Sequence, residues 1–217
     1  MTLVFNNKIL INVIPFFLGL LSSFGLPPYN LVLINFITFP IFLLLLINNS
    51  KNRKWISFNI GWMFGFGYFI SNLYWITNAL TFDEIFKPLI PIAFFSIPLF
   101  LGLFYGFVTL VCSFFKLEKN FNTILIFSTT FGIIEFIRSI ILGGFPWNLI
   151  VYSWTNYLHS LQILSLIGTY SLNLISITIF LMPLVIFFTK KYKFKLILFI
   201  FLLALLISNH LYGLKKD

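Results

Sequence analysis

Glu135 and Arg138 are the residues of this chain whose types and spacing point most clearly to chemistry. Both lie in the apolar stretch Thr123–Leu142, and the other apolar stretches of the chain carry no charge apart from Lys195 at the edge of the last one. A charge at the centre of a membrane helix costs roughly 2.5–3.5 kcal/mol on insertion scales, so each needs a partner or a polar cavity. Their three-residue spacing places them on one helix face, where they can pair.

Two interpretations of this pair stay open. In the first, the two residues form a structural ion pair that locks a helix bundle. In the second, Arg138 binds a lipid phosphate, because at about 1.5 Å per residue it lies only about 6–8 Å below the helix break at Gly143. The chain has 12 lysines and two arginines, so an arginine at this position suggests a site that needs the planar, bidentate geometry of a guanidinium.

The segment that follows this stretch is predicted to be an aromatic loop at the membrane surface. In Gly143-Gly-Phe-Pro-Trp-Asn148, two glycines end the helix, Pro146 stiffens the turn, and Trp147 suits the interface. Tyr152, Trp154 and Tyr157 extend the aromatic character, which is typical of a membrane–water boundary.

Other candidates for catalysis or metal binding are weak. Cys112 is the one cysteine, which excludes an intramolecular disulfide and a multi-cysteine metal site. It has no base near it in sequence, so we expect a buried thiol and no nucleophile. His159 and His210, without a carboxylate cluster, make a poor metal site. We therefore expect no metal, no cofactor and no catalytic residue in this chain.

Composition indicates the class of protein that must position these residues. Of 217 residues, 60% are hydrophobic and 9% are charged, and the mean hydropathy is +1.03. A soluble domain has about 25% charged residues, so a soluble enzyme, a nucleic-acid binder and a disordered linker are excluded as interpretations of the whole chain. The net charge of +9 fits cytoplasmic loops of a membrane protein better than a nucleic-acid partner.

Apolar runs separated by polar or Gly/Pro breaks predict an all-α, polytopic transmembrane bundle. We expect one transmembrane domain over residues 1–217 with about seven spans. The sixth is long enough to be tilted, or kinked at Pro183. Two Gly-x-x-x-Gly pairs, Gly61/Gly65 and Gly102/Gly106, would allow close helix packing. The expected spans are Ile9–Phe24, Leu31–Ile47, Trp55–Leu80, Leu89–Cys112, Thr123–Leu142, Leu161–Phe188 and Phe194–Ser208.

Basic residues predict the orientation of these spans. Ten of the 14 Lys and Arg residues fall on one side of a seven-span arrangement, and the positive-inside rule places that side in the cytoplasm. The N-terminus is then inside, the C-terminus outside, and the aromatic loop at the outer face. The ten residues are Lys8, Lys51, Arg53, Lys54, Lys116, Lys119, Lys190, Lys191, Lys193 and Lys195.

Several ordered motifs resemble the membrane domain of the apolipoprotein N-acyltransferase family. The most specific is Glu135-x-x-Arg138 followed by Gly144-Phe-Pro-Trp147 and then Tyr152. The others are Phe24-Gly-Leu-Pro-Pro-Tyr-Asn30, the glycine-rich stretch Gly61–Ile76 that contains Trp75, Gln162 with Gly168-x-Tyr170, and the tail Asn209–Lys215.

The resemblance implies a multi-pass enzyme of the bacterial inner membrane. The family transfers an acyl chain from a phospholipid to the diacylglyceryl-cysteine at the N-terminus of an apolipoprotein. Its Cys, Glu and Lys belong to a nitrilase-like domain after the seventh helix, and this chain stops where that domain would start. We therefore expect a truncated or split protein that is not active alone. It either works with a separately encoded nitrilase-like domain or is the remnant of a broken gene. The residues expected to contact lipid are Glu135, Arg138, Gly144, Phe145, Pro146, Trp147, Tyr152, Trp75 and Gln162.

Two other classes of function stay open. A small transporter or channel would use Glu135 and Arg138 in a pore, although such proteins more often show several broken-helix sites and internal symmetry. An inert membrane scaffold is the other alternative.

Overall fold

The computed structural model describes residues 8–49, 54–141, 146–189 and 200, and the described residues form helices and loops without a β-strand. The α-helices of the N-terminal half are α1 (Lys8–Ser23), α2 (Asn35–Asn49), α3 (Lys54–Asn72) and α4 (Ile90–Cys112). Those of the C-terminal half are α5 (Phe121–Ile140), α6 (Leu158–Leu161), α7 (Leu164–Ile167), α8 (Thr169–Leu181) and α9 (Pro183–Phe188). Between them, the described residues form the 3₁₀ helices η1 (Val32–Ile34), η2 (Tyr74–Thr81), η3 (Glu84–Leu89) and η5 (Ile150–Trp154).

Among the described residues, three helical stretches are long and apolar enough to cross a membrane: Val32–Asn49, Glu84–Cys112 and Phe121–Ile140. The same part of the chain contains two shorter apolar helices, Leu10–Ser23 and Thr169–Leu181. The predicted all-helical class is confirmed. The number of seven spans, the single domain and the orientation of the termini stay predictions, and the expected span Phe194–Ser208 and the tail Asn209–Lys215 lie outside the described residues.

Two expected spans are interrupted where the sequence suggested continuous helices. The α-helical part of Trp55–Leu80 ends at Asn72, and the chain continues as the 3₁₀ helix η2. The stretch Leu161–Phe188 is divided among α6, α7, α8 and α9. Gly168 causes one break, since its φ of +79° is a conformation that L side chains rarely adopt. Pro183 begins α9, as suits a residue without a backbone N–H.

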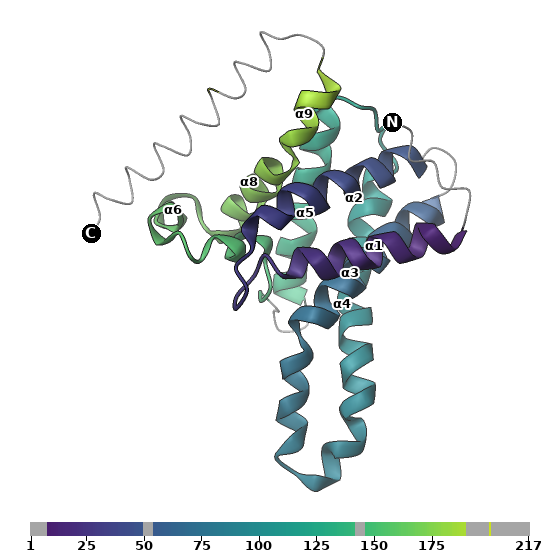
Figure 1. Ribbon diagram of the computed structural model, residues 1–217, viewed down its shortest axis with the longest axis vertical. Coiled ribbons are helices and arrows are strands. Elements are labelled where there is room, and N and C mark those ends of the chain that lie inside the picture. Colours follow the sequence, from purple (N-terminus) through teal and green to yellow (C-terminus); the bar gives the residue numbers. More distant parts are fainter. Residues whose placement is uncertain (1–7, 50–53, 142–145, 190–199, 201–217) are drawn as a thin grey trace. The chain divides into compact units, whose positions relative to one another are not determined.

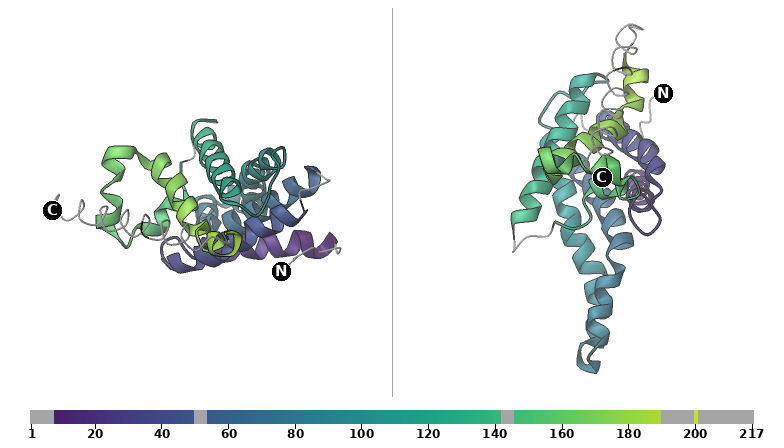
Figure 2. Two further views of the ribbon diagram at one scale, coloured as in Figure 1. Left: turned by 90° about the horizontal axis from the view of Figure 1, so that it is seen from above. Right: turned by 90° about the vertical axis from the view of Figure 1, so that its left-hand side faces the viewer.

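The chain forms two compact units (Figure 1). The first consists of residues 1–23 and 41–117, and the second of residues 24–40 and 118–217. In the first unit, α3 packs against both α1 and α4, and α3 and α4 form a long hairpin whose two arms run side by side (Figure 2, right). In the second unit, α5 packs against α8 around Phe39, Phe131 and Phe180, with ring centroids 5.9–6.0 Å apart.

Glycines let the helices of the first unit approach to backbone contact. A Cβ added to Gly19 would lie 1.9 Å from the carbonyl oxygen of Phe64, and one added to Gly67 would lie 2.0 Å from that of Phe16. On the α4 side, a Cβ at Gly61 would lie 2.2 Å from the carbonyl oxygen of Tyr105. The structure thus confirms the close packing expected from the Gly-x-x-x-Gly spacing.

This packing makes Gly61→Ala a destabilising change. The added methyl meets backbone, which cannot move aside as a side chain can, and such overpacking costs about 1–3 kcal/mol. The matched control is Gly132→Ala in α5, where the nearest atom is the Leu174 Cβ at 3.1 Å. We expect thermal unfolding in detergent to show a clearly lower midpoint for Gly61→Ala than for Gly132→Ala. Equal midpoints would show that α3 and α4 pack less closely than described here.

Candidate lipid-binding site

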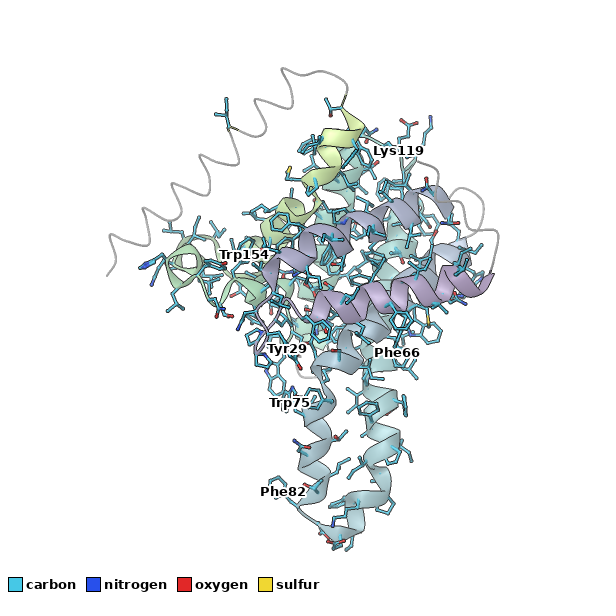
Figure 3. All side chains as sticks on the ribbon, viewed as in Figure 1. Tyr29, Phe66, Trp75, Phe82, Lys119 and Trp154 are labelled. Atoms are coloured by element: carbon cyan, nitrogen blue, oxygen red, sulfur yellow. The ribbon has the colours of Figure 1, made fainter. Side chains whose placement is uncertain are left out.

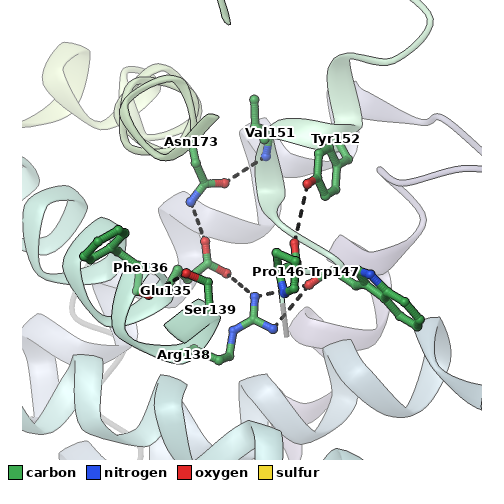
Figure 4. Close-up of polar contacts among 9 residues, drawn as sticks. All are labelled: Glu135, Phe136, Arg138, Ser139, Pro146, Trp147, Val151, Tyr152 and Asn173. Carbon is green, nitrogen blue, oxygen red and sulfur yellow. Dashed lines mark hydrogen bonds and ion pairs between the residues drawn. The ribbon is translucent and has the colours of Figure 1, made fainter. Parts of the chain in front are cut away.

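The second unit contains a buried polar network that begins at the last turn of α5. The guanidinium of Arg138 donates from both terminal nitrogens to the carbonyl oxygen of Trp147, at 3.2 Å each, and lies 3.5 Å from the Glu135 carboxylate (Figure 4). Arg138 is 1% exposed and Glu135 is fully buried. A cation in the last helical turn also complements the negative end of the helix dipole.

Asn173 of α8 completes the network from the other side. Its amide nitrogen donates to the second carboxylate oxygen of Glu135, and its amide oxygen accepts from the backbone N–H of Val151 at 2.9 Å. The segment after α5 is therefore attached at two points, the Trp147 carbonyl and the Val151 N–H. We call Glu135, Arg138 and Asn173 the α5–α8 latch.

The latch holds aromatic side chains at fixed places. Trp147 is 49% exposed although its carbonyl is bound by Arg138. Seven residues later in the chain, the indole N–H of Trp154 donates to the Ser176 hydroxyl at 3.0 Å, and its ring stacks on Phe180 at 5.4 Å. The result is a surface aromatic on a rigid support, which is the arrangement expected of an interfacial anchor.

Tyr152 lies beside the latch, with its hydroxyl 3.5 Å from the carbonyl oxygen of Pro146. Burial raises the pKa of the Tyr152 phenol, and the nearby Tyr170 and Glu135 raise it further against a lowering by Arg138. The phenol therefore keeps its proton at neutral pH and remains a hydrogen-bond donor.

The structure brings together five of the residues that the sequence singled out, namely Glu135, Arg138, Pro146, Trp147 and Tyr152 (Figure 4). Gln162 lies apart from the latch, at the turn between α6 and α7, where its carbonyl oxygen accepts from the Ser165 hydroxyl at 2.8 Å. Trp75 belongs to η2 of the first unit and is exposed. Gly143, Gly144 and Phe145 lie outside the described residues.

Asn173 was not among the residues that the sequence singled out. The sequence nevertheless indicated a role, because Asn173 is a lone amide in the apolar run of α8, and an amide in a membrane helix usually hydrogen-bonds to a neighbouring helix. What the spacing could not indicate was that its partner would be a carboxylate 38 residues earlier.

The residues of this site lie within a segment that matches a known protein family. Residues 18–182, which include the whole latch and Trp147, match the family described as the apolipoprotein N-acyltransferase N-terminal domain. The chain belongs to this family. The resemblance drawn from Glu135-x-x-Arg138 and the motifs around it is thereby confirmed.

Individual relatives agree with the family assignment. The chain is 32% identical over 177 residues to an apolipoprotein N-acyltransferase of Brucella melitensis, covering 77% of this chain and 33% of the relative. It is 34% identical over 178 residues to that of Rhodopseudomonas palustris, covering 80% and 33%. The chain thus spans about a third of the length of these curated relatives.

The latch predicts that Asn173→Ala destabilises the protein. The change leaves the Glu135 carboxylate and the Val151 N–H short of a buried hydrogen bond, which costs about 1–3 kcal/mol. Asn156→Ala is the control, because Asn156 is an exposed asparagine just after η5. We expect a lower unfolding midpoint and faster protease cleavage within residues 146–157 for Asn173→Ala alone. If both variants behave alike, the amide does not hold this segment.

Proposed function

We propose that this chain is the membrane part of an apolipoprotein N-acyltransferase and holds lipid substrates at the outer face of the bacterial inner membrane. The reaction served would transfer an acyl chain from a phospholipid to the α-amino group of a diacylglyceryl-cysteine at the N-terminus of an apolipoprotein. Family membership over residues 18–182 and the apolar helices support this proposal. The excess of basic residues on one predicted side supports an inside N-terminus and an outer location for residues 146–157.

One observation carries the lipid-binding role. The Trp147 side chain is exposed, while its backbone carbonyl is bound by the buried Arg138. An indole at the interface gives an acyl chain a flat apolar surface and keeps its N–H near the headgroups. We propose that Trp147 and Tyr152 contact the lipid and that the latch positions them. Direct binding of a headgroup by Arg138 stays a prediction, and it would require the guanidinium to turn away from the Trp147 carbonyl.

The alternative of a transporter or channel receives less support from the same geometry. A pore residue must be reached by water or substrate, yet Glu135 and Arg138 are at most 1% exposed and bind protein groups. Their burial favours a supporting role over a place on a conduction path.

Lipid retention tests the proposed site. We expect Trp147→Ala to lose most of the phospholipid that co-purifies with the full chain, as measured by native mass spectrometry. Trp55→Ala is the control, because Trp55 is 78% exposed but lies at the start of α3. Equal lipid retention in the two folded variants would remove the basis for a lipid site at Trp147 and favour a scaffold.

The position of Cys112 supports the proposal that this part of the protein binds lipid and that the nucleophile lies elsewhere. Its thiol is fully buried in α4, whereas a nucleophilic thiolate needs access and a nearby base. We propose that the acyl-carrying nucleophile is supplied by a nitrilase-like domain outside these 217 residues.

The 217-residue chain alone is therefore expected to form no thioester with a phospholipid acyl group and to leave a diacylglyceryl peptide unmodified. Incubation with labelled phospholipid followed by mass spectrometry measures both products. Acyl transfer that disappears in Cys112→Ser would contradict this expectation and assign the chemistry to the buried thiol.

A further inference from the structure

The C-terminal end of α4 carries a lysine that is held in place by the protein. Lys54, the first residue of α3, is exposed, and its ammonium donates to the carbonyl oxygen of Ser113 and lies 4.3 Å from the centroid of the Phe114 ring. The carbonyl oxygens of residues 109–112 already accept from the backbone N–H groups of residues 113–115. Lys54 therefore binds the next carbonyl of this helix end, where the helix dipole favours a cation.

This contact leaves the Lys54 ammonium able to bind an anion. An ammonium has three N–H donors, and the Ser113 carbonyl accepts from one of them. A carbonyl has only a partial charge, so the lysine keeps most of its positive charge. A phosphate oxygen carries a larger negative charge and forms the stronger, charge-assisted hydrogen bond with an ammonium.

An exposed apolar stripe on α4 leads to this ammonium. Phe100, Phe107 and Val111 lie on one face of the helix, because their spacings of seven and four residues correspond to whole turns. Phe114 continues the stripe just beyond the end of α4, and it is 69% exposed. Phe107 is 46% exposed, and its ring centroid lies 5.5 Å from that of Phe58 in α3. The stripe offers a lipid acyl chain an apolar surface that ends at a cation.

The position of Lys54 along the hairpin fits the headgroup region of a membrane. The apolar stretch Glu84–Cys112 is long enough to cross a bilayer, and Ser113 follows it directly. Lipid phosphates lie just beyond the hydrocarbon core, where lysines are enriched at the ends of spans. The contact with Ser113 therefore places the Lys54 ammonium near the level of the phosphates.

The charges around this end of the hairpin favour an anionic lipid. Residues 51–54 lead into α3 and residues 116–119 follow α4, and these two segments contain five basic side chains and one carboxylate, that of Glu118. Lys119, labelled in Figure 3, is the last of the five. A zwitterionic headgroup would bring its own cation to this positive surface, whereas a headgroup with a net negative charge is attracted to it.

We propose that Lys54 and the exposed stripe of α4 bind an anionic phospholipid, with the lipid phosphate on the Lys54 ammonium and an acyl chain along Phe114, Val111 and Phe107. In the orientation predicted from the basic residues, this lipid lies in the cytoplasmic leaflet. The site contains no residue of the α5–α8 latch and does not include Trp147. It needs only that α4 spans the bilayer, so it holds whether or not the proposed acyltransferase role is correct.

The lipid selectivity of the purified full chain tests the proposal. The chain in detergent is titrated with equal amounts of phosphatidylglycerol and phosphatidylcholine that have the same acyl chains, and native mass spectrometry gives the ratio of the two bound lipids. We expect a several-fold preference for phosphatidylglycerol, which Lys54→Arg keeps and Lys54→Gln largely loses. Glutamine is uncharged but still has a donor for the Ser113 carbonyl, so the helix end stays capped.

Lys87→Gln is the matched control, because it removes the same charge from an exposed lysine that pairs with Glu84. It should keep the preference. An equal preference in Lys54→Gln and Lys87→Gln would overturn the proposal and assign the selectivity to net charge alone. Equal binding of the two lipids by the unmodified chain would also overturn it.

This experiment is independent of the lipid site proposed at Trp147. The ratio of the two lipids is measured and not their total amount, so a loss of lipid elsewhere on the chain does not imitate the expected result. Thermal unfolding of each variant verifies that the helices are folded. A lower unfolding midpoint for Lys54→Gln together with an unchanged ratio would make Lys54 a helix cap only and overturn the proposal.

Discussion

The second unit depends on the need of a buried arginine for hydrogen-bond acceptors. In an apolar helix, Arg138 cannot rely on water, and the polar groups that it finds are the Glu135 carboxylate and the Trp147 carbonyl. Glu135 then needs a donor on its other side, and Asn173 supplies it. Each group thus determines the next, and together they join α5, α8 and the segment between them.

This constraint has a consequence for function because it acts on the backbone. The latch binds the carbonyl of Trp147 and the N–H of Val151, while the Trp147 side chain itself is 49% exposed. An exposed aromatic group on a fixed backbone is what the proposed lipid site requires.

The first unit relies on a different interaction, backbone contact between helices at glycine. Gly19, Gly61 and Gly67 bring α1, α3 and α4 into backbone van der Waals contact, and hydrogen bonds from Ser23 to Ser71 and from Trp62 to the Leu99 carbonyl oxygen add to this packing. The hairpin also exposes large apolar side chains, among them Phe100, Phe107 and Phe82.

The sequence by itself determined the helical class, the apolar stretches, the i,i+3 pairing of Glu135 with Arg138, and the family, because these depend on local composition and spacing. It also indicated the close packing at Gly61, since glycine spacing on one helix face is a local property. Only the tertiary structure showed that Arg138 binds the Trp147 carbonyl and that Asn173 donates a hydrogen bond to Glu135. It also showed that the helix expected over Leu161–Phe188 is interrupted at Gly168. A buried polar group must find some partner, but which one it meets depends on how helices far apart in the chain pack.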